Sequence, residues 1–227
     1  MTLKEGDFVE LEYTGRTEDD VIFDTTDEKV ARENELYNEK IAYGSATICL
    51  GEGHLLPGLD KRLVGQKEGK HTISLTPEEG FGKRDAKYIQ LISTSKFIKQ
   101  GFKPVPGLQV NVDDMVGVVK TVSGGRTIVD FNNPLAGRKV IYEVKIGKTI
   151  TDVTKQLVSL MRFTFKLAQP EIKIDSDKAV LTFAHDLPKE AQDLVTKKIS
   201  ELTKIKKVEY LSTHTEKPSA PVAKKTA

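Results

Sequence analysis

Residues Leu50–Gly69 read LGEGHLLPGLDKRLVGQKEG, a pattern in which glycines separate a strand from a short helix. The glycines are Gly51, Gly53, Gly58 and Gly65, and the leucines at helical spacing are Leu55, Leu56, Leu59 and Leu63. Glycine adopts backbone conformations closed to other residues, so a strand can end sharply and a helix can begin at once. Pro57 suits the first helical turn, where its missing N–H would be unpaired anyway. The segment predicts a short helix whose apolar face is turned toward a sheet, either as plain packing or as part of a site.

Segments on both sides of this stretch have the alternating pattern of half-buried strands. The predicted strands are Phe8–Tyr13, Val21–Asp24, Thr47–Leu50, Lys70–Leu75 and Lys139–Ile146, with a helix around Glu28–Glu39 in a charged excursion. Several strands with one short helix between them favour an α+β fold, an antiparallel five-stranded sheet curled around that helix.

Residues 86–132 have different chemistry and predict a small β-rich domain. Its expected strands are Tyr88–Ile92, Val110–Thr121 and Thr127–Phe131. A module of this size buries only a small core, so part of its apolar surface should stay exposed. We assign Val110, Val118, Ile128 and Phe131 to the core, and we expect Phe97, Phe102 and Met115 to lie on loops. The candidate surface for binding unfolded chains comprises Leu91, Ile92, Phe97, Phe102, Met115 and Val116.

Residues 149–212 predict a C-terminal α/β domain of α-β-β-α-β order. A helix begins near Thr149, a hairpin pairs Glu171–Ile174 with Lys178–Ala184, a helix spans Pro188–Leu202, and a strand spans Lys206–Leu211. Each helix has one apolar stripe, so we expect this part to fold on its own and to offer a surface for a homodimer. Residues 213–227 predict a disordered tail.

Composition excludes several classes of function. Lys and Arg number 35 against 33 Asp and Glu in 227 residues, so no bulk field attracts nucleic acid or an anionic membrane. The single cysteine, Cys49, fits a reducing compartment, and its apolar neighbours favour a buried side chain over a nucleophile. Without a signal peptide or a membrane-spanning run, we expect a cytoplasmic protein. The four histidines lack ligand spacing, so we expect no metal and no cofactor.

Four further motifs accompany the glycine-rich segment in a fixed order. They are GDFVELEYTG (Gly6–Gly15), VIFDTT (Val21–Thr26), PEEGFG (Pro77–Gly82) and NPLAGRKVIYEV (Asn133–Val144). Together they resemble the FKBP-type peptidyl-prolyl cis/trans isomerases, and most closely the SlyD-type branch in a long, archaeal-like variety. The resemblance implies an isomerase domain of residues 1–85 and 133–148, a chaperone-like domain of residues 86–132 inserted in its flap, and a C-terminal extension.

The resemblance also implies which residues form the isomerase pocket. They are Tyr13, Phe23, Asp24, Leu55, Leu56, Leu59, Phe81 and Tyr142. Asp24 would orient Tyr13 or polarise the bound carbonyl, and the Leu56 N–H would donate to a substrate carbonyl. Leu59 and Ala46 stand where single-domain members have aromatic residues, which argues against high affinity for macrolide inhibitors.

The implied function is a prolyl isomerase with chaperone activity, acting on unfolded or partly folded polypeptides that contain X–Pro bonds. The alternative is a holdase or peptide-binding module with little isomerase activity. A metallochaperone is a third possibility, which the absence of a His-rich tail weakens.

Overall fold

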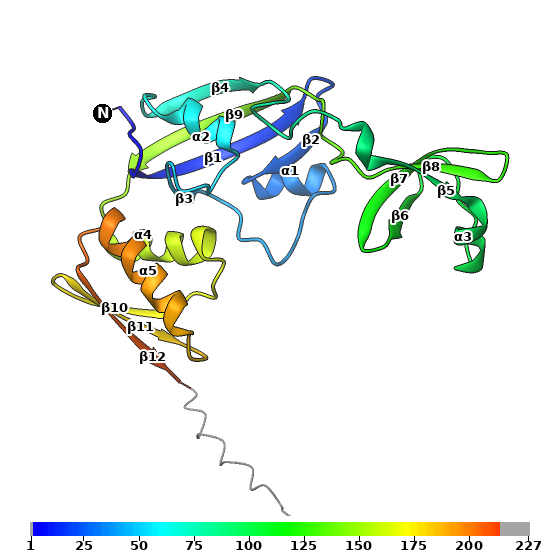
Figure 1. Cartoon of the computed structure of the whole chain (residues 1–227). Helices are drawn as coiled ribbons and strands as arrows, with labels where there is room; N and C mark the ends of the chain where they lie inside the picture. The colour runs from blue at the N-terminus through cyan, green and yellow to red at the C-terminus, as the bar shows by residue number, and fades with distance from the viewer. Residues whose placement is uncertain (1, 214–227) are drawn as a thin grey trace, which may run out of the picture. The chain divides into compact units, whose positions relative to one another are not determined.

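The computed structural model describes residues 2–213, whose helices and strands give a mixed α+β fold with mainly antiparallel sheets (Figure 1). Two compact units divide these residues. The first contains residues 2–14, 24–73 and 143–213, and the second contains residues 15–23 and 74–142. From residue 214 onward, the predicted tail lies outside the described residues.

One sheet has five strands in the order β2-β1-β9-β4, with β3 paired to β1. They are β1 (Phe8–Thr17), β2 (Ile22–Thr25), β3 (Ala46–Cys49), β4 (Gly69–Leu75) and β9 (Val140–Thr149). The β1–β3 pairing is antiparallel and places Phe8 opposite Cys49. Alternate residues of β9 are buried from Val140 to Ile146, as the apolar pattern predicts. All five predicted strands are present, with ends that differ by a few residues.

The glycine-rich segment forms the predicted helix, α2 (Pro57–Leu63). Pro57 occupies its first turn, and Leu59 and Leu63 are buried. Gly65 follows the helix with φ of +87°, a left-handed conformation that glycine adopts without strain.

The helix of the charged excursion is shorter than predicted. It is α1 (Glu28–Glu33), and the Asp27 carboxylate caps it by accepting the N–H of Lys29 at 2.8 Å. The predicted end at Glu39 is wrong because Glu35 takes a left-handed φ of +58°, which turns the chain out of the helix.

A four-stranded antiparallel sheet lies in the second unit, in the order β5-β8-β7-β6. Its elements are the 3₁₀ turn η1 (Ala86–Tyr88), β5 (Ile89–Ser93), α3 (Thr94–Lys99), β6 (Gln109–Val112), β7 (Met115–Ser123) and β8 (Arg126–Asp130). The single strand predicted for Val110–Thr121 is wrong, because Asp113 and Asp114 turn the chain into a hairpin with φ of +51° and +63°. Aspartate tolerates this left-handed conformation better than most residues, and two such residues close a hairpin.

Phe97 has a different place from the one expected. It lies in α3 rather than on a loop, and its side chain is 0% exposed, packed with Val110, Val119 and Val129. Phe102 packs partly against the same cluster, with its ring 5.6 Å from that of Phe97. A sheet this small needs a large side chain to close its core, so Phe97 is a core residue and cannot offer its ring to a partner.

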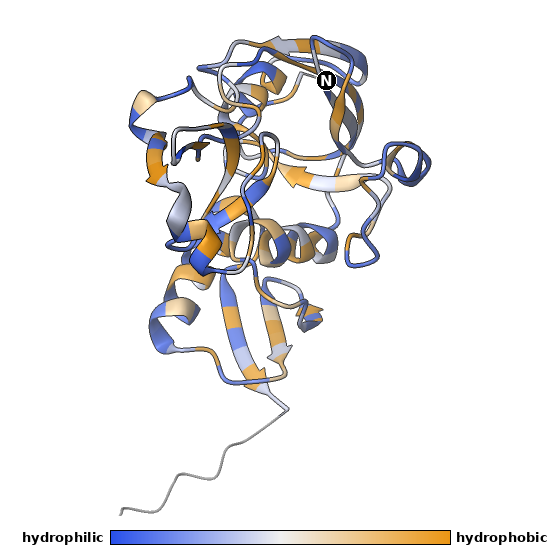
Figure 2. Cartoon of the chain, turned by 90° about the vertical axis from the view of Figure 1, so that its right-hand side faces the viewer, coloured by the Kyte–Doolittle hydropathy of each residue, from blue (hydrophilic) through white to orange (hydrophobic). Residues whose placement is uncertain are grey.

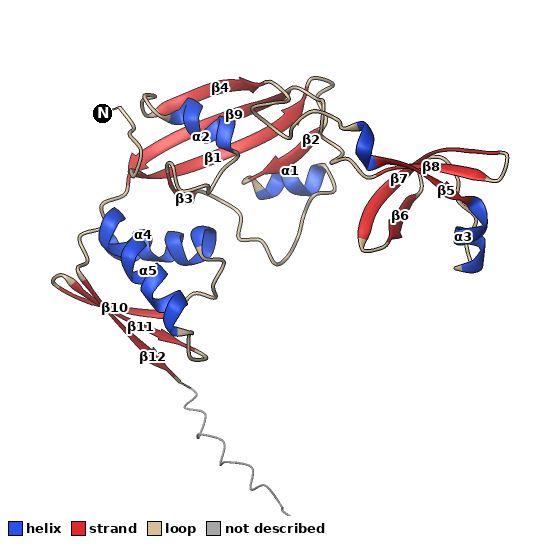
Figure 3. Cartoon of the chain, in the orientation of Figure 1, coloured by secondary structure: helices blue, strands red, loops and turns tan. Residues whose placement is uncertain are grey.

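The C-terminal elements form an α-β-β-α-β arrangement, as the sequence predicts (Figure 3). They are α4 (Val153–Ser159), the π-helix η2 (Leu160–Thr164), β10 (Glu171–Asp175), β11 (Lys178–Phe183), α5 (Lys189–Leu202) and β12 (Lys207–Ser212). β10 and β11 make an antiparallel hairpin, and β12 runs parallel to β11. Figure 2 shows hydrophilic and hydrophobic residues along β12, whose residues are alternately exposed and half-buried.

The core of these C-terminal elements includes residues from the five-stranded sheet. Phe8 of β1 and Cys49 of β3 are buried in one cluster with Leu157, Leu181 and Ile199. These elements lie in one compact unit with β3 and part of β1, and the domain boundary at Thr149 stays a prediction. Residues of α4, η2 and α5 pack in this core with side chains of β1 and β3.

Candidate functional site

Three aromatic side chains implied by the resemblance meet in the second unit. The ring of Phe23 in β2 lies 5.5 Å from that of Phe81 and 5.7 Å from that of Tyr142 in β9, both in edge-to-face geometry. Tyr142 is only 3% exposed, whereas Phe23 and Phe81 are half-buried. Edge-to-face rings at this spacing attract one another beyond their shared burial, so the cluster is a preformed apolar wall.

Gly15 of β1 makes this cluster possible, and sequence reasoning assigned it no role. A Cβ placed on Gly15 would lie 2.8 Å from Phe23 Cζ and 2.9 Å from Tyr142 Cε1. The two rings thus rest directly on the backbone of β1. A glycine inside a strand pattern often marks such a close approach, and this was the signal available in the sequence.

We predict that Gly15→Ala lowers the prolyl isomerase activity implied by the resemblance about fivefold, because the added methyl group must push both rings out of place. Overpacking of this kind costs about 1–3 kcal/mol of stability, so the variant should remain folded. Peptide isomerisation and thermal unfolding should be measured together. Gly147→Ala is the control, since its Cβ would crowd Glu10 at 3.1 Å and no aromatic ring. Wild-type activity in Gly15→Ala would refute a role for the ring cluster.

Tyr13 and Asp24 meet in the first unit, and the Tyr13 hydroxyl donates a hydrogen bond to the Asp24 carboxylate. Burial raises the pKa of Tyr13, and the negative charge of Asp24 raises it further. Asp24 keeps exposed surface, but desolvation of its carboxyl group raises its pKa, against the opposing effect of hydrogen bonds from Tyr13 and the Thr25 N–H. Tyr13 therefore stays a neutral hydroxyl whose orientation Asp24 fixes.

The segment before α2 holds the two adjacent leucines, Leu55 and Leu56, both half-buried. Leu56 is the last residue before the helix, and Leu59 in the helix is 1% exposed. Asp60 stabilises this segment, because its Oδ2 accepts the N–H of Gly51 at 2.9 Å. Burial raises the pKa of Asp60, which is another residue that sequence reasoning missed.

The structure brings the predicted site residues together in two groups. Tyr13 pairs with Asp24 in the first unit, which also contains Leu55, Leu56 and Leu59. Phe23, Phe81 and Tyr142 cluster in the second unit. The two groups are linked in sequence at one point, because Phe23 directly precedes Asp24 in β2. Their assembly into one pocket stays a prediction.

Ala46 lines a groove that sequence reasoning did not anticipate. In the first unit this groove runs between β3 and the C-terminal helices, and Phe163 and Arg162 of η2 lie along it. The guanidinium group of Arg162 is 5.0 Å from the ring centroid of Phe163. The C-terminal elements thus share a groove with Ala46, a position where single-domain members have an aromatic residue.

Burial and residue spacing bear on two other kinds of chemistry, nucleophilic attack by a thiol and metal binding. Burial raises the pKa of Cys49 to about 12, so its thiol is not a nucleophile at neutral pH. Within residues 2–213, no three His, Cys, Asp or Glu side chains are grouped so that they could hold a metal ion. No helix in the same range is long and apolar enough to cross a bilayer.

Comparison with known families and proteins identifies the class of enzyme. The family described as FKBP-type peptidyl-prolyl cis-trans isomerase matches residues 1–98, and the family described as FKBP26, IF domain, matches residues 90–135. A short-type peptidyl-prolyl cis-trans isomerase of Methanocaldococcus jannaschii is 30% identical over 145 residues, which make up 63% of this chain and 92% of that protein. The chain therefore belongs to the FKBP-type peptidyl-prolyl cis-trans isomerases.

Bacterial relatives agree with this assignment. A probable FKBP-type 16 kDa isomerase of Pseudomonas fluorescens is 37% identical over 107 residues, covering 44% of this chain and 70% of that one. The SlyD isomerase of Haemophilus influenzae is 28% identical over 152 residues, covering 64% of this chain and 72% of that one.

A crystal structure of the three FKBP domains of wheat FKBP73 is similar only at a TM-score of 0.34 and 15% identity, over 66% of this chain and 41% of that one. This similarity is too weak to argue from.

Proposed function

We propose that this isomerase also acts as a chaperone, with residues 86–132 capturing unfolded polypeptides and the pocket isomerising their X–Pro bonds. The proposal rests on apolar side chains that are exposed around the four-stranded sheet β5-β8-β7-β6, although other residues fill the core of that sheet. Leu91 is 60% exposed, Ile98 59%, Val116 54% and Met115 38%, while Val129 and Phe97 are completely buried. Exposed aliphatic side chains in such numbers on a small module favour a binding surface.

The client-binding surface that we propose differs from the sequence prediction at Phe97, which is buried, and at Ile98, which is exposed. Leu91, Met115 and Val116 are exposed, and Ile92 is half-buried. Phe97 belongs to the core cluster instead, and Phe102, like Ile92, is half-buried and packs against that cluster. Ile98, on the outer side of α3, takes the place in the surface that Phe97 was expected to have. A flexible side chain such as Met115 adapts to varied partners, which suits a binder of unfolded chains.

The pocket needs no nucleophile and no metal for this reaction. Rotation about a peptide bond meets a barrier of about 18–20 kcal/mol because resonance stiffens the C–N bond. The planar imide is more dipolar than the twisted one, so a water-poor wall of Phe23, Phe81 and Tyr142 favours the twisted form. In our proposal the Leu56 N–H binds a substrate carbonyl, and Asp24 orients the Tyr13 hydroxyl.

We also propose that the chain belongs to the SlyD-type branch with an insert in the flap. Two hydrogen bonds close the insertion where it leaves and rejoins the chain, from the Asp85 N–H to Asn132 Oδ1 at 2.8 Å and from Asn132 Nδ2 to the Asp85 carbonyl at 3.1 Å. An ion pair between Arg84 and the buried Asp130 reinforces them.

We also propose a homodimer through the C-terminal elements, where Leu194 and Leu211 are 56% and 55% exposed. A measurement of the molecular mass in solution tests this proposal.

The test compares two substrates for the full chain. We expect it to accelerate isomerisation of a short proline peptide and also the refolding of a protein whose slow step is proline isomerisation. A holdase would suppress aggregation of the refolding protein and leave both rates unchanged. Acceleration of the peptide reaction alone would contradict the proposed chaperone function.

A further inference from the structure

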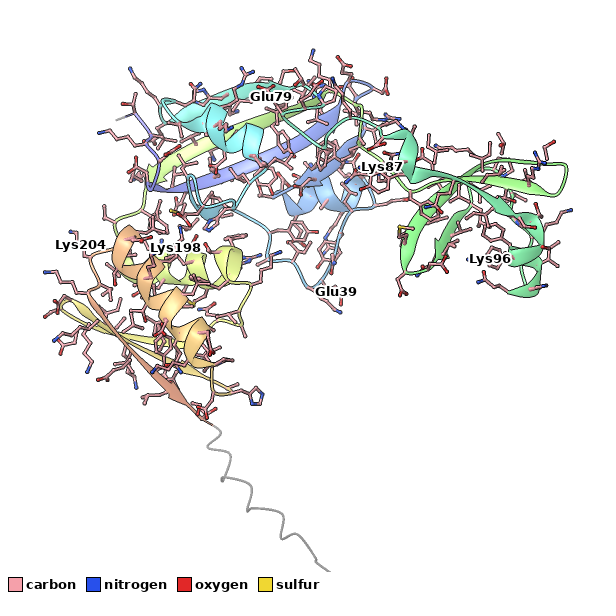
Figure 4. All side chains as sticks on the ribbon, viewed as in Figure 1. Glu39, Glu79, Lys87, Lys96, Lys198 and Lys204 are labelled. Carbon is pink, nitrogen blue, oxygen red and sulfur yellow. The ribbon has the colours of Figure 1, made fainter. Side chains whose placement is uncertain are left out.

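Three polar contacts join the C-terminal elements to β3 and to the segment between β3 and α2, all within the first unit. Ser159 Oγ at the end of α4 donates to the Thr47 carbonyl at 2.6 Å. Thr164 Oγ1 of η2 lies 2.7 Å from His54 Nε2. Lys198, which projects from α5 in Figure 4, pairs with Glu52 at 2.8 Å. The π-helix η2 is thus fixed against the stretch that leads to Leu55 and Leu56.

His54 is the central contact of the three. Its Nδ1 accepts the Cys49 N–H at 3.0 Å, so the ring proton is on Nε2 and is donated to Thr164 Oγ1. The imidazole also lies 5.3 Å from the ring of Phe163. Burial lowers the pKa of His54 to about 4, which keeps the ring neutral and this pattern of donors and acceptors intact at neutral pH.

The backbone around His54 is held by hydrogen bonds, among them the one from the Gly51 N–H to Asp60 Oδ2 at 2.9 Å. Gly51 and Gly53 have φ of +84° and +69°, and a Cβ on Gly53 would meet nothing within 4 Å. Glycines in open space allow many conformations, so the path of this segment depends on its hydrogen bonds. His54 directly precedes Leu55 in the chain, so we expect a displacement of its ring to move the backbone of Leu55 and Leu56.

We infer that His54 is a positioning residue of the isomerase, held by Thr164 of η2, and that the C-terminal elements form part of the catalytic apparatus. This inference rests on the proposed function, in which the Leu56 N–H binds a substrate carbonyl. Small displacements of a group that contacts the reacting bond lower rates strongly. The contact therefore gives η2 a role in catalysis at a distance from the pocket.

Thr164→Val is the most selective test, because it removes one hydroxyl group and keeps the shape of the side chain. We expect kcat/KM for a proline tetrapeptide to fall about fivefold in Thr164→Val and about tenfold in His54→Leu. Thr164→Ser and His54→Gln keep a donor and an acceptor at these positions, and both should retain at least half of the wild-type value. Thr151→Val, the same change at an exposed residue of the C-terminal part, is the matched control.

The amide signals of Leu55 and Leu56, followed by NMR in the full-length variants, separate positioning from general destabilisation. We expect them to shift in Thr164→Val and to return in Thr164→Ser, at a temperature where every variant is folded. Unchanged kcat/KM in both Thr164→Val and His54→Leu would overturn the inference, as would a loss of activity without any shift at Leu56. An inactive wild-type chain would instead refute the proposed function.

Discussion

Replacing residues 86–132 by a short turn that contains glycine is expected to slow catalysis of proline-limited protein refolding about a hundredfold. Isomerisation of a short proline peptide should change less than threefold. Capture by the insertion makes delivery of a client's proline intramolecular, and effective concentrations in such systems reach the mM range. A short peptide needs only the pocket, so it gains nothing from capture.

The structure shows that this replacement is practical. Asp85 and Asn132 are joined by hydrogen bonds of 2.8 and 3.1 Å, so a few residues can bridge the two ends. Both activities should be measured on the shortened chain and on the full chain at equal concentration. A fall by the same factor in both would mean that the insertion only supports the pocket.

Point variants separate capture from support of the fold. Leu91→Asp and Val116→Asp place charges in the exposed apolar surface and should lower refolding catalysis about tenfold together. Thr121→Asp adds the same charge at an exposed residue of β7 that is already polar, and it should leave refolding catalysis unchanged. Equal losses in all three would indicate that charge on this sheet, and not loss of apolar contact, causes the effect.

Asp24→Ala is expected to lower peptide isomerisation about tenfold, equivalent to about 1.4 kcal/mol of transition-state stabilisation. The variant removes the acceptor that orients the Tyr13 hydroxyl. Asp24→Asn keeps an acceptor and should lose less activity, and Asp19→Ala, an exposed carboxylate elsewhere in the chain, should lose none. Wild-type rates in Asp24→Ala would refute the role of the Tyr13–Asp24 pair.

Tyr142→Ala is expected to lower activity severalfold, although this result is harder to interpret. Tyr142 is 3% exposed and packs against Phe23, so removing its ring leaves a cavity. Aromatic-to-alanine changes in cores typically cost about 3–5 kcal/mol of stability. Thermal unfolding of Tyr142→Ala must therefore accompany its kinetics.

Sequence periodicity correctly predicted the strands and helices that bury one face. The alternation along β9 and the leucine spacing of α2 both follow from one strand or helix covering one face. The Asp113–Asp114 turn was missed because it contains neither glycine nor proline, the usual signals of a hairpin. Phe97 was misplaced because apolar residues of a small module look alike in sequence, whether they close its core or cover its surface.

The parts of the site that sequence could not supply depend on contacts between distant segments. The cluster that joins Phe8 and Cys49 to Leu157 and Ile199 links residues more than a hundred positions apart. The contact between His54 and Thr164 is of the same kind. No local sequence pattern predicts such pairs, because the pattern of each segment indicates its own strand or helix and says nothing of the distant segment that it contacts.

The most direct test of the account is NMR of the isotopically labelled full chain with a proline tetrapeptide. We predict faster exchange between the cis and trans signals of the peptide, together with amide shifts at Asp24, Leu55 and Leu56 and at residues beside Phe81. Shifts confined to residues 86–132, or exchange no faster than in the free peptide, would contradict the assignment of the isomerase pocket.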